Sequence, residues 1–330
     1  MARPGRVTHI RRRRVAAAAA VLAGLGGCAP PDAAPLPPGA FAFGVFGDAP
    51  YYAWEQGPWR RVLKDVAAAE LAFFVHVGDI LWEPCSEEMY RRRRAQLDAV
   101  PLPVIYTPGD NEWADCHEPR PGGYAPLERL SVLREVFFVD PERSLGGTPI
   151  RLASQASDTL YGEFVENARW EREGVMFATL HLVGSTNAMD PFEGRTVADD
   201  LAAERRTEAA LAWLRQTFAH ARARGSWGMV LLAHADLGLT DEDEEYGHDR
   251  FVDALRDEVA AFPGEVLYVH GDSHDYLVDH SLRDRDGNPF DNFTRVETLG
   301  SPRVGWVRIV TDPASRRFTE FEPRWMRGYW

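Results

Sequence analysis

Short apolar runs alternate along the chain with longer amphipathic stretches, and four of the runs lead to the same pair of residues. Each run has the length and composition of a buried strand. The runs cover residues 42–46, 71–77, 104–106 and 266–269, and they are followed by Gly47-Asp48, Gly78-Asp79, Gly109-Asp110 and Gly271-Asp272. Glycine lets a chain turn sharply as it leaves a strand. The pattern therefore predicts four aspartates beyond the carboxyl ends of strands, where open α/β sheets place their ligands.

Amphipathic stretches fill the intervals between the first three runs. Residues 53–69 carry apolar side chains at helical spacing, and residues 86–99 begin with Ser86 and two acids, a signature of a helix N-terminus. The first three aspartates are evenly spaced, since 79 − 48 and 110 − 79 both equal 31. This is about the length of one strand-helix-strand unit. The βαβαβ order predicts parallel strands with right-handed crossovers.

The remainder of the chain is more mixed. Further helices are predicted at residues 125–138, 199–222 and 250–261. Further strands are predicted at residues 159–165, 175–183, 228–233, 294–299, 305–310 and 317–321. An α/β first half that leads into a β-rich tail predicts an α/β fold, a four-layer αββα sandwich in which two mixed sheets pack face to face with helices outside.

The N-terminus differs from the rest of the chain in composition. Six arginines precede or flank an apolar stretch, residues 15–25, that is short for a bilayer span, and Leu25-Gly26-Gly27-Cys28 follows. This segment resembles the lipobox of bacterial lipoproteins, which implies a signal peptide over residues 1–27 and a lipid on Cys28. An ordinary signal peptide or an uncleaved anchor is the alternative. Residues 28–39, rich in Pro and Ala, are predicted to tether a domain at 40–330 to the bacterial cell envelope.

Net charge argues against one class of partner. The formal charge is −13 at pH 7, and loss of residues 1–27 would remove six arginines and no acids, giving 31 − 50 = −19. A chain this acidic is not attracted to nucleic acid or to anionic membranes. We therefore expect no nucleic-acid partner, and membrane contact only through the lipid. Four consecutive arginines at 91–94 are the local exception and are predicted to form a solvated helix face.

Two cysteines remain beyond Cys28. Cys85 and Cys116 each lie six residues after a Gly-Asp aspartate, on equivalent loops of neighbouring predicted strands. In an exported protein this arrangement favours a disulfide. Free thiols and soft-metal ligation are the alternatives.

Two histidines are predicted at the same kind of position as the aspartates. His234 ends an apolar run, and His274 lies two residues beyond Asp272. Acids gathered at one sheet edge repel each other unless a cation lies among them. Carboxylates and neutral imidazoles can hold one or two divalent cations, and two such metals supply what phosphoester hydrolysis requires.

The order of these blocks resembles the calcineurin-like metallophosphoesterase superfamily, whose blocks are D-x-H, G-D-x-x-D/N, G-N-H-D/E, a strand-terminal His and G-H-x-H. In this chain they are residues 48–50, 78–82, 109–112, His234 and residues 271–274, and the resemblance covers most of residues 42–280. It implies a two-metal phosphoesterase with a defined set of ligands. Asp48 and His274 would bind the first metal, and Asp79 would bridge both. The second metal would be bound by Asp110, His234 and Asp272.

Two of the departures from the family's blocks concern metal ligands. Pro50 stands in place of the first-block histidine, so the first metal lacks a ligand unless Tyr51, Tyr52 or water supplies one. Trp82 stands where the second block has Asp or Asn, and an indole cannot coordinate a metal.

The third departure concerns catalysis. Asn111 occupies the slot of the family's histidine that stabilises the transition state or protonates the leaving group. The general acid is unassigned; His117, on the loop after Asp110, is the best candidate for a substitute, with a surface histidine as the alternative. The substitutions leave an oxygen-rich site, which favours Mn, Mg, Fe or Ca over Zn.

Other polar residues near predicted strands have simpler interpretations. His76 and His181 are expected to be packed core residues, whereas His270 could replace Asp272 as a ligand. Asn187 could reach the pocket, but a turn is the expected role. Residues 284–288 loosely resemble a calcium loop without its closing glutamate, so we expect a hairpin turn.

Two functions are compatible with these residues. The first is a lipid-anchored, metal-dependent hydrolase acting on a small phosphoester, which Asp79, His234 and His274 favour. The second is a non-catalytic metal- or phosphate-binding surface lipoprotein, which the histidines missing at Pro50 and Asn111 favour. We expect the hydrolase, and the sequence leaves its oligomeric state open.

Overall fold

The computed structural model describes residues 36–240 and 246–326. The predicted signal peptide, Cys28 and most of the tether lie outside the described residues, so these remain predictions. None of the described helices is long and apolar enough to cross a membrane.

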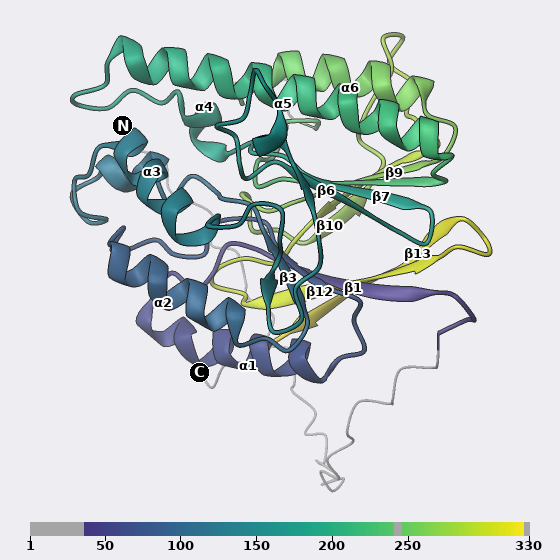
Figure 1. The fold of residues 1–330 in the computed structure, drawn as a ribbon, viewed down its shortest axis with the longest axis horizontal. Coiled ribbons are helices and arrows are strands. Elements are labelled where there is room, and N and C mark those ends of the chain that lie inside the picture. The colour runs from purple at the N-terminus through teal and green to yellow at the C-terminus, as the bar shows by residue number, and fades with distance from the viewer. Residues whose placement is uncertain (1–35, 241–245, 327–330) are drawn as a thin grey trace, which may run out of the picture. The chain divides into compact units, whose positions relative to one another are not determined.

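Two mixed β-sheets lie face to face with helices outside (Figure 1). The first sheet contains, in spatial order, β13 (Arg317–Trp325), β12 (Gly305–Asp312), β1 (Phe41–Phe46), β2 (Phe74–His76), β3 (Pro103–Tyr106) and β4 (Leu145–Gly146). The second contains β10 (Leu277–Asp279), β11 (Phe293–Glu297), β9 (Glu265–His270), β8 (Gly228–Leu232), β7 (Val175–Thr179), β6 (Ala168–Arg172) and β5 (Ala153–Ser154).

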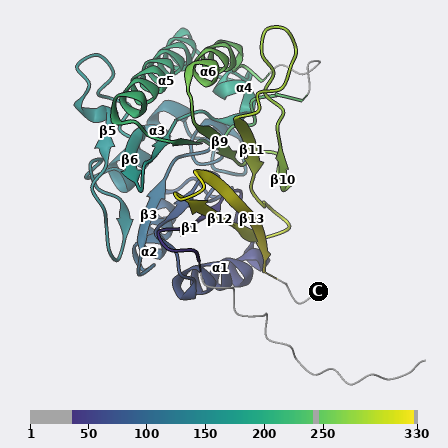
Figure 2. The ribbon, with the colours of Figure 1, turned by 90° about the vertical axis from the view of Figure 1, so that its right-hand side faces the viewer.

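Helices form the two outer layers. The first sheet is covered by α1 (Gln56–Ala68), α2 (Glu87–Asp98) and α3 (Pro126–Phe137), and the second by α5 (Val197–Arg224) and α6 (Asp249–Ala261). Turned by 90°, Figure 2 again shows α5 and α6 on one side and α1 on the other, with β9 and β1 between them. Short turns complete the fold: η1 (Ala53–Glu55), η2 (Ala114–His117), η3 (Gln155–Ser157) and α4 (Gly184–Ala188). The expected αββα sandwich is confirmed.

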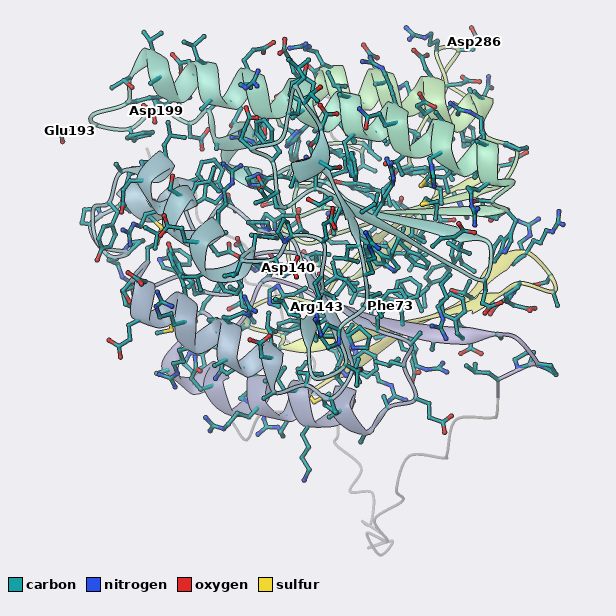
Figure 3. All side chains as sticks on the ribbon, viewed as in Figure 1. Phe73, Asp140, Arg143, Glu193, Asp199 and Asp286 are labelled. Carbon is teal, nitrogen blue, oxygen red and sulfur yellow. A yellow bond between two sulfur atoms is a disulfide. The ribbon has the colours of Figure 1, made fainter. Side chains whose placement is uncertain are left out.

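Side chains alternate between the two faces of each strand, and those on the inner faces form the core between the sheets. In β1, Phe41, Phe43 and Val45 face the second sheet, while Phe46 faces the helices. The Phe43 ring centroid lies 5.3 Å from that of Phe73 and 5.4 Å from that of Phe177. Figure 3 labels Phe73. These aromatic side chains join the two sheets by burial of apolar surface.

The predicted topology of the first half is confirmed. β1, β2 and β3 are parallel neighbours, with Val45 opposite Val75 and Val75 opposite Ile105. Ser86 is the N-cap of α2, and its hydroxyl accepts a hydrogen bond from the Met89 amide at 3.2 Å. The carboxyl ends of the three strands therefore lie at one edge of the sheet.

The prediction of a strand at residues 159–165 is wrong. The Asp158 carboxylate accepts hydrogen bonds from the amides of Leu160 at 2.8 Å and Tyr161 at 3.2 Å, which fixes a turn in place of a strand. The strand lies instead in β6, whose charged residues obscured the alternation. The sequence analysis also did not predict β10, a strand of three residues.

The expected disulfide is present. Cys85 and Cys116 are bonded, and they link the loop after β2 to the loop after β3. Each of these loops also carries a Gly-Asp aspartate, so the disulfide connects two segments that contribute to the same edge of the sheet.

The arginines at 91–94 form a solvated face only in part. Arg91 pairs with Glu87 and Arg94 with Asp98 on the surface of α2. Arg93 is buried and donates hydrogen bonds to the carbonyl oxygens of Ile80 at 2.9 Å and Pro50 at 3.2 Å. Its guanidinium thus joins the loops that follow β1 and β2, a role that helical periodicity does not reveal.

Replacement of Phe177 by Ala should destabilise the domain strongly, because its ring is fully buried between the sheets. We expect the free energy of unfolding to fall by about 3–5 kcal/mol, measured by urea denaturation. Leu160→Ala is the control, because Leu160 is 60% exposed and its truncation should cost under about 0.5 kcal/mol. A loss below about 1 kcal/mol for Phe177→Ala would contradict the described packing.

Candidate metal centre

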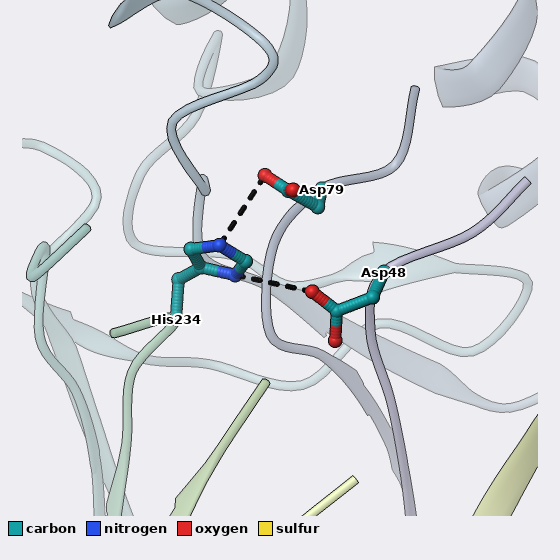
Figure 4. Close-up of side chains that lie close together, drawn as sticks. All are labelled: Asp48, Asp79 and His234. Atoms are coloured by element: carbon teal, nitrogen blue, oxygen red, sulfur yellow. Dashed lines mark ion pairs between the residues drawn. The ribbon is translucent and has the colours of Figure 1, made fainter. Parts of the chain in front are cut away.

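The six predicted ligands converge where the carboxyl ends of strands from the two sheets meet. Asp48, Asp79 and Asp110 follow β1, β2 and β3, whereas His234 follows β8, and Asp272 and His274 follow β9. In Figure 4 the His234 ring makes ion-pair contacts with both Asp48 and Asp79. Two groups of possible ligands share this imidazole: Asp48, Asp79 and His234, and Asp110, His234 and Asp272.

The imidazole nitrogens are the centre of the cluster. His234 Nε2 lies 3.1 Å from Asp110 Oδ1, 3.4 Å from Asp79 Oδ1 and 3.7 Å from Asp272 Oδ1. His234 Nδ1 is 3.9 Å from Asp48 Oδ1. His274 Nε2 approaches Asp48 Oδ1 at 3.6 Å from the other side. Side chains that are far apart in the sequence thus form one continuous polar site.

Both histidines are held in the orientation that metal ligation needs. His234 Nδ1 lies 3.0 Å from the Val77 carbonyl oxygen, and His274 Nδ1 lies 2.8 Å from that of Ser301. With the proton on Nδ1, each Nε2 has its lone pair directed at the carboxylates. Backbone carbonyl groups thus select the tautomer, as is usual around metal-binding histidines.

Glycines border the site because nothing larger fits there. A Cβ on Gly78 would lie 2.7 Å from His234 Nδ1, and a Cβ on Gly300 would lie 2.7 Å from the Asp48 Cβ. Glycine was expected to make the turns, but the aspartates themselves adopt left-handed φ angles of 57° at Asp48, 58° at Asp79 and 80° at Asp272. Short polar side chains tolerate this region better than most. Close approach of the loops is therefore the main role of these glycines.

Burial and mutual repulsion raise the pKa values of the carboxyl groups, whereas His234 lowers them. Burial raises the pKa of Asp272 to about 7, with the charges of Asp110 and Asp48 adding to the shift and that of His234 opposing it. Burial also acts on Asp110, but the adjoining His234 outweighs it and lowers the pKa to about 2. For Asp48 and Asp79, burial is the largest cause of a raised pKa.

The same contacts raise the pKa of His234. Burial alone would lower it, but the charges of Asp79, Asp110 and Asp272 together hold the pKa well above its ordinary value. A proton on His234 is thus the main positive charge among three buried carboxylates and the partly buried carboxylate of Asp272. Asp48 Oδ2 and His234 Nε2 are buried with no hydrogen-bond partner among the described residues. Divalent cations fit this donor set, because they would satisfy these atoms and neutralise the acids.

Tyr51 lies where the first-block histidine is missing. Its hydroxyl donates a hydrogen bond to Asp79 Oδ2 at 2.5 Å and lies 3.3 Å from His274 Nε2. Burial, followed by the charges of Asp79 and Asp48, raises the pKa of Tyr51 well above its ordinary value, so the phenol keeps its proton. Tyr52 is directed elsewhere, since it is 38% exposed and stacks on Trp54. Trp82 packs edge-on to Tyr51 with ring centroids 5.8 Å apart.

Asn111 and His117 differ in their relation to the cluster. The Asn111 amide Nδ2 donates to Asp79 Oδ2 at 2.5 Å, and its backbone N–H donates to Asp79 Oδ1 at 3.1 Å. The His117 ring instead stacks on Phe192 with centroids 4.4 Å apart, and its Nδ1 lies 2.8 Å from the Ala114 carbonyl oxygen. Asn111 therefore orients the shared aspartate, while His117 packs beside the site.

Three residues that the sequence analysis did not single out support the ligands. Ser185 Oγ lies 2.6 Å from Asp110 Oδ2, in a turn whose residues 185–188 all have positive φ. Glu112 is buried and accepts hydrogen bonds from the Ile80 amide and the Tyr106 hydroxyl. Glu55 accepts from the Tyr51 amide at 2.6 Å and the Ser301 hydroxyl at 2.5 Å. Of these, only Glu112 has a sequence signal, its place in the third block.

The simpler interpretations of two histidines agree with their surroundings. His76 is enclosed by the rings of Phe46, Trp59 and Tyr106, and burial lowers its pKa to about 3. His181 is buried beside the Glu166 carboxylate at 2.5 Å. Both side chains therefore belong to the interior of the domain.

The structure also shows where Asn187, residues 284–288 and His270 lie. Asn187 Nδ2 donates to Thr207 on α5 and so fastens the turn to that helix. Asp284 accepts hydrogen bonds from the amides of Asp286 and Asn288, which makes residues 284–288 a turn. His270 does not take the place of Asp272, because it lies with Asp236 and Glu297 in a separate group. Burial lowers the pKa of His270 to about 4, so its imidazole is neutral.

Known structures with this architecture bear on the chemistry of the site. None of the protein-family models and none of the curated proteins matches this chain. A dimetal phosphatase from Danio rerio has a similar structure, with a TM-score of 0.55 at 14% sequence identity over 87% of this chain and 96% of that one. The chain has a metallophosphoesterase-type fold. At this identity the similarity establishes the fold, and the chemistry must be argued from the residues.

Two further structures are less similar to this metallophosphoesterase-type domain. GAP50, described as the anchor in the inner membrane complex of Plasmodium, has a TM-score of 0.49 at 8% identity over 87% of this chain and 89% of its own. A 5'-nucleotidase from Candida albicans has a TM-score of 0.41 at 11% identity over 81% of this chain and 46% of its own. The fold assignment rests on the phosphatase, because both of these scores lie below 0.5.

Metal affinity should rise with pH. A cation binds the deprotonated forms of Asp272 and His234, whose pKa values are raised to about 7 and well above 6.5 respectively, so binding releases protons. We expect the affinity for Mn²⁺ to increase about tenfold per pH unit between pH 6 and 8, measured by titration calorimetry. Equal affinities at pH 6 and pH 8 would contradict the protonated state of the metal-free cluster.

Tyr51→Phe should weaken metal binding without unfolding the protein, because it removes only the hydroxyl that orients Asp79. We expect the affinity for Mn²⁺ to fall by about 10–100-fold, the usual effect of losing a hydrogen bond to a metal ligand. Tyr52→Phe is the matched control and should leave the affinity unchanged. If both variants bind as the unmodified protein does, the hydroxyl of Tyr51 has no part in the site.

Proposed function

We propose that the protein is a metal-dependent hydrolase of phosphate esters. The observation that carries this proposal is the pair of ligand groups that share His234 at the meeting edge of the two sheets. A metallophosphoesterase-type fold supports it. Export and lipid attachment at Cys28 belong to the same proposal, and the disulfide between Cys85 and Cys116 fits an oxidising compartment.

The ligands divide into two sets by position. His274 lies 3.6 Å from Asp48, and these two residues would hold the first cation with Asp79. Asp110 and Asp272 lie around His234 Nε2 and would hold the second. Asp79 is placed to contact both sets. Four carboxylates and two imidazoles form an oxygen-rich site, which favours Mn, Mg, Fe or Ca over Zn.

When bound, two divalent cations would activate a water molecule and neutralise charge on the phosphoryl group. The chain's own residues fix the geometry. Tyr51 and Asn111 both donate hydrogen bonds to Asp79 Oδ2, which holds the shared carboxylate in one rotamer. Ser185 does the same for Asp110. This pre-organisation lowers the cost of aligning the reacting groups.

Protonation of the leaving group is assigned to solvent. Asn111 has no titratable proton, and its amide is already committed to Asp79. His117, expected as a general acid, packs against Phe192 at the wall of a small cavity. We therefore propose water for this step, with His117 as the remaining side-chain candidate.

One observation favours a second function on the same scaffold. The residue that replaces the family's transition-state histidine, Asn111, makes its hydrogen bonds inside the ligand cluster. A non-catalytic metal- or phosphate-binding lipoprotein needs no proton donor at this position. Such a protein would bind metal tightly and show no turnover.

An assay of the purified protein distinguishes the two functions. Chromogenic phosphomonoester and phosphodiester substrates would be supplied with Mn²⁺, Mg²⁺, Fe²⁺ or Zn²⁺. We expect metal-dependent hydrolysis that falls by on the order of 10²-fold or more in Asp79→Asn, because this variant loses the shared carboxylate. Asp284→Asn, in a surface turn, is the control and should retain activity. Bound metal without hydrolysis of either substrate class would favour the binding protein.

A further inference from the structure

A third group of possible metal ligands lies beside the first two. Asp236 is on the loop after β8, His270 ends β9 and Glu297 ends β11, which are three neighbouring parallel strands of the second sheet. One ligand atom of each residue lies within 4.8 Å of the others. The proposed hydrolytic function uses none of these side chains.

His270 supplies a nitrogen that nothing else occupies. The imidazole is fully buried, and its Nδ1 is 2.7 Å from the Gly271 carbonyl oxygen, which places the proton on that nitrogen. Nε2 has no hydrogen-bond partner among the described residues. Leaving a buried polar atom without a partner is costly, and this nitrogen is free to take a ligand.

The two carboxylates are already oriented by hydrogen bonds. Glu297 is buried, and its Oε1 accepts the Asp275 amide at 2.7 Å. Asp236 accepts hydrogen bonds from the Gly238 amide at 2.9 Å and from the Ser273 hydroxyl at 3.0 Å. Ligating carboxylates are commonly supported in this way by surrounding donors.

Arg295 does not neutralise the group. Its buried guanidinium is directed mainly at Asp279, with contacts of 3.2 Å from Nε and 2.5 Å from Nη2, and it reaches Asp236 only at 3.4 Å. One cationic side chain thus faces three carboxylates, those of Asp236, Asp279 and Glu297. Burial raises the pKa of Glu297 to about 8. With all three carboxylates ionised, two negative charges remain in a partly buried region, and a divalent cation would balance them.

We propose that Asp236, His270 and Glu297 bind a third divalent cation, separate from the two of the hydrolytic site. One imidazole nitrogen and two carboxylates suit Mn²⁺, Fe²⁺ or Zn²⁺. The cation would join the ends of β8, β9 and β11. The segment between His270 and Asp275 carries Asp272 and His274, and the Asp236 amide donates to Asp272 Oδ2 at 3.0 Å. The third site therefore braces the loop that presents two of the proposed hydrolytic ligands.

Anomalous diffraction from crystals of the protein soaked in Mn²⁺ or Zn²⁺ tests this proposal. We expect an anomalous peak within ligand distance of His270 Nε2, Glu297 and Asp236, in addition to any peaks among the six hydrolytic ligands. Glu297→Gln keeps the shape and the acceptor for the Asp275 amide but loses the charge. It should abolish the third peak and lower the bound metal by one equivalent per chain in elemental analysis.

Two further variants make the result specific. His270→Gln should also abolish the third peak, whereas Asp110→Asn should weaken peaks in the hydrolytic site and leave the third in place. If the unmodified protein shows no peak between the three residues with either metal, Arg295 suffices as the counter-charge and the proposal is wrong. Turnover is not part of the readout, so the outcome is independent of whether the protein hydrolyses phosphate esters.

Discussion

Repulsion among three buried aspartates and one partly buried aspartate is the constraint on which the rest of this structure depends. Asp48, Asp79, Asp110 and Asp272 are brought to one edge of the sandwich, where burial raises the pKa of three of them. Without added cations, a proton on His234 is their main counter-charge. Because desolvated like charges are costly unless they are balanced, the arrangement suits a site that exchanges protons for divalent cations.

The surrounding fold keeps this unfavourable cluster in place. Left-handed φ angles at non-glycine residues cost roughly 1 kcal/mol each, and they recur at Asp48, Asp79, Asp272 and His274. An aromatic core between the sheets and helices on both outer faces offset this strain. Arg93 and the Cys85–Cys116 disulfide then tie the loops after β1, β2 and β3 to each other. Rigid strands thus present strained loops, which is a common arrangement at functional sites.

Much of the architecture could be predicted from periodicity alone. Alternating apolar residues and a helix N-cap at Ser86 identify the first βαβαβ unit, and its parallel register follows from connection lengths. Residues 159–165 show where this reasoning fails, because a hydrogen bond from the Leu160 amide to the Asp158 side chain overrides a strand-like pattern. Arg93 shows a second failure. It lies within a run of charged residues, yet its side chain is buried and links two loops.

The amino-acid sequence by itself determined which residues reach the site, because each Gly-Asp pair follows a strand and parallel strands end at the same edge. Tertiary structure alone decided how those residues are used. Only there does Tyr51, next to the position that lacks the first-block histidine, donate a hydrogen bond to Asp79, and only there does His270 lie with Asp236 and Glu297 and not with Asp272. The physical reason is that the positions of the strands along the chain depend on local periodicity, whereas hydrogen bonds and charge balance depend on contacts between loops that are distant in the chain.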